Sequence, residues 1–258
     1  MRMSEFKSEV DKVLDRFHTG TGRIMQLSFL SQYTRTLFTK DKTREEFLHD
    51  LSKDHIEMFS DSFPDCAQYV DKYGPREGYW RWSRSLPRKS NRWLYQQLLV
   101  FLVTIFEAFI QDVLLATFCK EPRCMSSDRN ISWKQVIELG DYDSIIVHIA
   151  SRRVADVLSG DWRKIVDEFR NLFNIDLDAD IEAKPISEIF EIRHAVVHNA
   201  GACDLRLISK IQKSEWGILY NLDKDIILNK RTLEKMTRYV DYAAVSIYEL
   251  ILNKFEPI

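Results

Sequence analysis

Apolar residues recur at intervals of three and four positions along most of the chain, and this spacing predicts amphipathic helices. In the N-terminal part it predicts a first helix that ends at the sequence HTGTG (18–22), followed by helices over 23–39 and 42–60. Most of the residues that interrupt helices then cluster between 61 and 90, namely Pro64, Gly74, Pro75, Gly78 and Pro87. We therefore predict two parts, an N-terminal helical extension (1–88) and a C-terminal helical domain (89–258).

The C-terminal part begins with the most apolar helix of the chain, predicted over 91–118. Its middle is apolar on nearly all sides, a pattern typical of the central helix of a bundle. The segment 215–228 alternates β-branched and polar residues around a polar turn, which predicts a small hairpin or extended arm before the last helix. The predicted fold class is all-α, an antiparallel helical bundle. Its further helices are expected over 132–139, 143–158, 161–173 (capped by Asp161), 185–199 (with Pro185 in its first turn) and 230–254 (after Asn229).

Composition and charge narrow the function classes only slightly. Of the 258 residues, 45% are hydrophobic and 29% are charged, as in globular proteins, and the formal net charge of −2 provides no overall attraction for polyanions. Four cysteines without a C-x-x-C pair are typical of a reducing compartment. The most apolar run, 98–110, is shorter than a membrane span and contains Glu107. We therefore expect a cytoplasmic protein without a membrane partner.

One apolar helix is interrupted by Arg193, His194 and His198, within the run FEIRHAVVHNAG. An arginine retains its charge, so its side chain must meet water, a carboxylate or a bound anion. His194 and His198 are four positions apart and share one helix face, whereas Arg193 and His198 are five apart and diverge by about 140° on an ideal helix. One interpretation is structural: Arg193 pairs with Glu107 or Glu191, and His198 stabilises the C-terminal end of its own helix.

The same helix also offers metal ligands, because Glu191 and His194 form a Glu-x-x-His pair and His198 follows His194 by one helical turn. Neither pair is accompanied by the further ligands that a two-metal carboxylate site or a zinc site requires. A glycine-rich loop for phosphate or dinucleotide binding does not occur in the sequence either. We therefore expect no metal and no cofactor.

The motif R-x4-H followed by asparagine, formed by Arg193, His198 and Asn199, resembles the signature of the HEPN superfamily. The surrounding order of elements is similar too. A long buried helix with the sequence FEAFIQDVL precedes the motif, HNAG-x-x-D follows it, and a strand-like arm leads into the last helix. The chain resembles most the bacterial HEPN branch linked to RNA repair and phage defence. This resemblance covers about residues 91–256, and residues 1–88 match no family that we can name.

The resemblance implies a HEPN-like bundle that acts as a homodimer and cleaves RNA without a metal, in a bacterial defence or toxin setting. The RNA 2′-hydroxyl would attack the adjacent phosphorus and leave a 2′,3′-cyclic phosphate. Arg193 would hold the phosphate, His198 would transfer protons and Asn199 would assist, with His194 and Glu107 in supporting roles. A neutralising or sensor protein partner is also expected. The alternative is a non-catalytic HEPN module that binds nucleotide, RNA or a partner protein.

The stretch YWRWSRSLPRKSNRW (79–93) is the densest basic and aromatic segment. Its cations suit phosphates, and Trp80 and Trp82 suit stacking on bases. The alternative is a linker whose tryptophans fix it to the core. The residues predicted to bind RNA are Arg81, Arg84, Arg88, Lys89 and Arg92.

Overall fold

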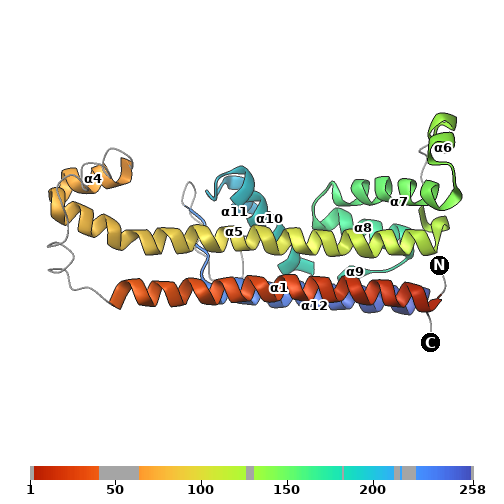
Figure 1. Ribbon diagram of the computed structural model, residues 1–258, viewed down its shortest axis with the longest axis horizontal. Coiled ribbons are helices and arrows are strands. Elements are labelled where there is room, and N and C mark those ends of the chain that lie inside the picture. The colour runs from red at the N-terminus through yellow and green to blue at the C-terminus, as the bar shows by residue number, and fades with distance from the viewer. Residues whose placement is uncertain are drawn as a thin grey trace. The chain divides into compact units, whose positions relative to one another are not determined.

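The computed structural model, drawn in Figure 1, describes the following parts of the chain: residues 3–40, 64–125, 131–181, 183–211, 216 and 225–256. Within these ranges every regular element is a helix, and strand-like pairing is limited to one isolated bridge between Ala202 and Asp225. The predicted all-α fold class is confirmed.

The chain forms two compact units. The larger unit combines Met1–Met25 with Leu98–Ile258, and the smaller unit consists of Gln26–Gln97. This division differs from the predicted one in two ways. The first 25 residues belong to the larger unit, and a single helix, α5 (Pro75–Lys120), continues through the predicted boundary.

The residues predicted to interrupt helices between 61 and 90 leave only one non-helical position in the described part of this segment, Gly74 between α4 and α5, and Pro87 lies within α5. Pro64 is the first residue of α4 (Pro64–Tyr73) and Pro75 is the first residue of α5, positions at which proline costs no helical hydrogen bond. Gly74 joins the two helices with a φ of +81°. A Cβ at Gly78 would lie 2.3 Å from the Tyr69 carbonyl oxygen, so glycine permits α4 and α5 to approach closely.

Helix α1 (Met3–Lys40) has no break at the HTGTG sequence, so the prediction of a helix end there is wrong. The Thr19 hydroxyl donates to the Asp15 carbonyl at 2.9 Å, and the Thr21 hydroxyl donates to the His18 carbonyl at 3.2 Å. These threonines therefore satisfy their hydroxyls within the helix. Gly20 faces Ile105 of α5, and a Cβ there would lie 3.0 Å from the Ile105 side chain. Close packing of α1 against α5 thus explains the glycine at position 20. The helix predicted over 42–60 lies outside the described residues.

Replacing Gly22 with alanine is expected to raise the free energy of unfolding by up to about 1 kcal/mol, because alanine is the better helix former by that amount. A Cβ at this position meets no atom within 4 Å. Gly20→Ala is the matched comparison and should raise the free energy of unfolding by less, because its Cβ would press on the Ile105 side chain. Urea denaturation followed by circular dichroism measures both variants. A destabilised Gly22→Ala protein would contradict a continuous α1.

The remaining helices of the described residues belong to the larger unit, and five of them lie close to the predicted bounds. Asp161 caps α8 as predicted, because its side chain accepts from the Lys164 N–H. Helix α12 starts after Asn229 as predicted, and the Asn229 side chain accepts from the Thr232 N–H. These helices are η1 (Pro122–Met125), α6 (Trp133–Leu139), α7 (Tyr142–Leu158), α8 (Trp162–Phe173), α9 (Leu177–Asp180), α10 (Ala183–His198), α11 (Leu205–Lys210) and α12 (Lys230–Phe255).

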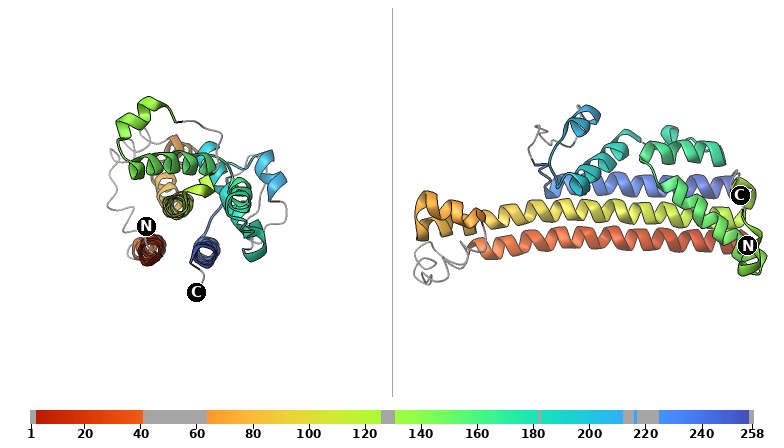
Figure 2. Two further views of the ribbon diagram at one scale, coloured as in Figure 1. Left: turned by 90° about the vertical axis from the view of Figure 1, so that its right-hand side faces the viewer. Right: turned by 90° about the horizontal axis from the view of Figure 1, so that it is seen from above.

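In the larger unit, the N-terminal part of α1 lies beside α5 and α12, as the end-on view in Figure 2 shows. The Tyr248 hydroxyl of α12 donates to the Asp11 carboxylate of α1. Lys120, the last residue of α5, donates to the Phe255 carbonyl of α12 at 2.9 Å. Residues 3–25 are therefore part of the bundle and not of a separate extension.

The core of this unit is centred on Phe106 of α5, which is completely buried. Its ring centroid lies 6.1 Å from Phe17 of α1, 5.8 Å from Trp162 of α8 and 6.3 Å from Phe190 of α10. A single aromatic side chain thus joins four helices, and it connects the helix that carries the R-x4-H motif to the rest of the bundle.

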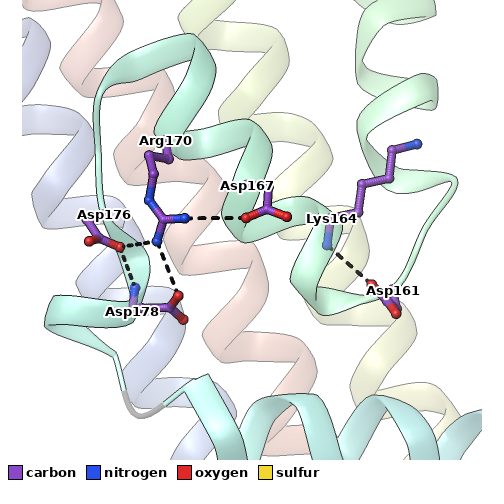
Figure 3. Close-up of polar contacts among 6 residues, drawn as sticks. All are labelled: Asp161, Lys164, Asp167, Arg170, Asp176 and Asp178. Carbon is purple, nitrogen blue, oxygen red and sulfur yellow. Dashed lines mark hydrogen bonds and ion pairs between the residues drawn. The ribbon is translucent and has the colours of Figure 1, made fainter.

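The turn after α8 is fixed by Arg170, which reaches three carboxylates (Figure 3). Its guanidinium donates to Asp176 at 2.7 Å, to Asp178 at 3.2 Å and to Asp167 at 3.3 Å. Asn174 at the C-terminal end of α8 adopts a left-handed conformation, with a φ of 53°. The chain then turns through α9 toward α10, so these exposed contacts shape the approach to the motif helix.

The predicted hairpin or arm over 215–228 falls mostly on residues outside the described ranges. Residues 226–229 are described without helical or strand assignment, and the Ile226 N–H donates to the Gly201 carbonyl at 2.8 Å. This contact places the residues before α12 next to the end of α10.

Among the described residues, one helical segment, Trp93–Lys120, is long and apolar enough to cross a membrane by length and composition. Half of its most apolar window is buried inside the structure. Its buried residues include Phe106, so this segment also meets the description of a core helix.

Candidate functional site

The R-x4-H motif lies at the C-terminal end of α10, and most of the apolar side chains of this helix are buried in the bundle. The helix ends directly after His198, as predicted. The N–H groups of Asn199 and Gly201 both donate to the Ala195 carbonyl, at 3.0 and 3.2 Å. Ala200 and Gly201 have φ values of 51° and 78°, the left-handed conformation that commonly ends a helix. Burial along α10 therefore continues to Val196 and ends at Val197 and His198, which are exposed.

Arg193 forms an ion pair with Glu107 of α5, as one of the predicted structural interpretations requires. The Arg193 Nη2 and the Glu107 Oε2 are 3.5 Å apart, and about a quarter of each side chain is exposed. Burial raises the pKa of the Glu107 carboxyl, and the charge of Arg193 partly opposes this shift. The Nε of Arg193 is buried without a hydrogen-bond partner. This guanidinium thus has one long ion pair and unused donor capacity.

His194 and His198 lie side by side, as their spacing predicts. Their ring centroids are 4.4 Å apart and the rings are tilted by 41°. His198 is exposed, whereas His194 is partly buried. In the described part of the chain, no hydrogen bond joins Arg193 to either imidazole. One copy of the chain therefore brings the two histidines together and directs the arginine toward Glu107.

Helix α11, next to α10 in Figure 1, adds two cations that the sequence analysis did not identify. The Arg206 Nη1 lies 3.3 Å from the His194 Nε2, and the Arg206 Nε lies 3.5 Å from the Glu191 carboxylate. Lys210 contacts the other oxygen of Glu191. The sequence feature that could have indicated these cations is the spacing of Arg206 and Lys210, four positions apart on a short helix after the motif.

Asn199 fixes the start of α11. Its side-chain amide donates to the Asp204 Oδ2 at 2.6 Å, and the Asp204 Oδ1 accepts from the Leu207 N–H at 2.7 Å. Hydrogen bonds from Leu207 and Asn199 lower the pKa of the Asp204 carboxyl. The predicted role of Asn199 was to assist Arg193 and His198. Its observed contact instead joins the end of α10 to the N-cap of α11.

The basic stretch 79–93 lies within α5 and is not a linker. Arg81 pairs with Glu77 at 2.7 Å and lies over the Tyr73 ring, 4.5 Å from its centroid. Trp82 is buried, so it does not present a surface for base stacking, and the prediction of that role is wrong. The side chains of the other predicted RNA-binding residues lie outside the described part of the structure: Arg84, Arg88, Lys89 and Arg92.

Among the described residues, no group of three or more His, Cys, Asp or Glu side chains could hold a metal ion. Glu191, one of the metal ligands considered from the sequence, contacts Lys210 and Arg206.

Comparisons of the chain with protein-family models, with curated proteins and with solved structures find no match. The interpretation of the site therefore depends on its own residues and their geometry.

We expect the His194 imidazole to titrate below pH 6.5, because burial lowers its pKa, and Arg206 and His198 add to the effect. The unfolded chain binds this proton more readily than the folded chain. His194 therefore reduces the free energy of unfolding as the pH falls below about 6.5. Titration of the histidine ring protons by NMR measures the midpoint, and Arg206→Gln should raise it. A wild-type midpoint above 6.5 would contradict the observed surroundings of His194.

Proposed function

We propose that the chain is a metal-independent endoribonuclease of the HEPN type that acts as a homodimer. The observation that carries this proposal is the pair of imidazoles 4.4 Å apart at the exposed end of a buried helix, one residue from an arginine. Two histidines and an arginine supply proton transfer and phosphate binding without a metal.

His198 suits proton transfer because its side chain is exposed and an imidazole exchanges protons near neutral pH. In the proposed reaction, His198 takes the proton from the RNA 2′-hydroxyl, and the 2′-oxygen bonds to the adjacent phosphorus. The bond from phosphorus to the 5′-oxygen of the next nucleotide breaks, and a protonated imidazole returns a proton to that oxygen. The products are a 2′,3′-cyclic phosphate and a 5′-hydroxyl. In a homodimer, the two copies of His198 supply one proton acceptor and one donor.

Arg193 suits phosphate binding because it retains its charge and has donors beyond its contact with Glu107. A phosphate dianion or a phosphodiester in the site would compete with a carboxylate 3.5 Å away. Glu107 then acts as a positioning residue that holds the guanidinium until the strand binds. Asn199 contributes by fixing α11 beside the motif.

Apolar side chains beside the motif are exposed, and a second copy of the chain could cover them. Val197, adjacent to His198, is 46% exposed, and Leu205 at the start of α11 is 69% exposed. Burial of such side chains stabilises association. Contact through this surface would bring two motifs together and would add a second Arg193 and His198 to the site.

A non-catalytic HEPN module that binds nucleotide, RNA or a partner protein is the second candidate. The ion pair between Arg193 and Glu107 favours it, because this contact gives the arginine a structural role that requires no substrate. The two candidates differ in one measurable property, the cleavage of RNA.

The test is incubation of the purified full chain with single-stranded RNA in EDTA, followed by analysis of the new ends. The proposal requires 2′,3′-cyclic phosphate and 5′-hydroxyl ends, and intact DNA of the same sequence, because DNA lacks the attacking hydroxyl. Sedimentation measures the expected homodimer. RNA binding without cleavage would support the non-catalytic module, and cleavage that requires added metal would contradict both candidates.

We also propose a cytoplasmic role in bacterial defence, in which a neutralising or sensor protein restrains the nuclease. Free nuclease activity in a cell is harmful, so expression of the wild-type chain should slow growth. The His198→Ala variant should not. Equal growth inhibition by the two proteins would contradict this setting.

A further inference from the structure

We propose that Arg206 of α11 is an RNA-binding residue of this site and holds a phosphate of the bound strand beside the imidazole pair. The inference rests on the proposed function, since it assigns a further substrate contact to the same site. Arg206 lies outside the R-x4-H motif, and the packing of α11 beside α10 brings it to the site.

Arg206 is held in place by a buried carboxylate. Glu191 of α10 is only 5% exposed, and a buried carboxylate is costly unless it is paired. Its two oxygens face two cations of α11, Lys210 at Oε1 and Arg206 at Oε2. Because Glu191 lies one helical turn before His194, the same contact sets the guanidinium against the His194 ring.

The start of α11 is fixed independently of Glu191. Asp204 caps the helix and accepts from Asn199, the residue directly after the motif. The carboxylate of Asp204 also attracts Arg206, but its oxygens accept hydrogen bonds from Asn199 and Leu207. Helix α11 is thus fixed at its start by Asp204 and at its end by Lys210, so Arg206 loses less conformational entropy when it binds a ligand.

Arg206 retains the capacity to bind a phosphate. Its contacts use Nε and Nη1, a guanidinium has five N–H donors, and 51% of the side chain is exposed. The contact with His194 involves an imidazole whose pKa is lowered, so at neutral pH the partner is uncharged. Glu191 is shared between Arg206 and Lys210, and a planar guanidinium matches phosphate oxygens in pairs.

The experiment measures binding of the full chain to a fluorescent single-stranded 2′-O-methyl RNA in EDTA, at a series of salt concentrations. This RNA lacks the attacking hydroxyl and stays intact. Arg206→Gln should weaken binding about tenfold, the value of one charge-assisted contact. It should also reduce the slope of log affinity against log salt by about 0.7, the effect of losing one phosphate contact on a single strand.

Two further variants separate binding from folding. Arg206→Lys keeps the charge and should keep the wild-type salt slope. Arg123→Gln removes an arginine whose side chain is 95% exposed on η1, away from the motif, and should change neither affinity nor slope. Circular dichroism shows whether each variant is folded.

The inference is overturned if Arg206→Gln has the wild-type slope, or if the slope of Arg206→Lys falls equally far, since charge would then play no part. If the wild-type chain cuts RNA while Arg206→Gln keeps its slope, only this inference fails. If the wild-type chain binds RNA with the expected effect of Arg206→Gln but does not cut it, the proposed nuclease fails and the RNA contact remains. If the wild-type chain neither binds nor cuts RNA, both fail.

Discussion

Replacing His198 with alanine is expected to lower the rate of the proposed RNA cleavage by about 10²–10⁴-fold, the usual contribution of a general acid or base. His198 is exposed at the last position of α10, so its removal leaves the core intact. The measurement is the rate of cleavage of a labelled RNA in EDTA, with the free energy of unfolding determined in parallel. A loss of rate at unchanged stability separates a chemical role from a structural one.

His18→Ala is the matched control for this variant. His18 is also exposed and lies in the same unit, on α1, where its Nδ1 is 3.9 Å from the Asp241 carboxylate. Its removal should leave the cleavage rate unchanged. If His198→Ala retained more than a tenth of the wild-type rate with its fold intact, His198 would not be the group that transfers protons.

Replacing Phe106 with alanine is expected to lower the free energy of unfolding by about 3–5 kcal/mol, the cost of truncating a buried phenylalanine and leaving a cavity. Phe106 is fully buried where α1, α8 and α10 meet α5. A loss of this size is a large part of the stability of an ordinary domain. Urea denaturation followed by circular dichroism measures it.

Phe101→Ala provides the comparison on the same helix. Phe101 is 58% exposed, so its truncation should change the free energy of unfolding by no more than about 0.5 kcal/mol. Equal effects of the two truncations would contradict the observed orientation of α5. A large effect of Phe106→Ala would also support the assignment of residues 3–25 to the larger unit, because Phe17 loses a partner in that variant.

The candidate site was only partly predictable. The adjacency of His194 and His198 and the end of α10 at Asn199 follow from spacing and turn residues. The sequence analysis also named Glu107, with Glu191 as the alternative, as a partner of Arg193, because a buried arginine requires a counter-charge. It did not identify Arg206, since a cation on a short helix is most often solvated and nothing in its sequence surroundings specifies a partner.

The sequence by itself determined the helical fold class, the ends of α8, α10 and α12, and the face that the two histidines share. These features depend on hydrogen bonds and side-chain spacing within a few consecutive residues, so they are encoded locally. Only the tertiary structure decided that α1 continues through its glycines against Ile105, that residues 3–25 join the C-terminal helices, and that Arg206 lies against His194. Such contacts depend on which buried faces pack together, and the burial of Glu191 rather than any local pattern brings Arg206 to the site.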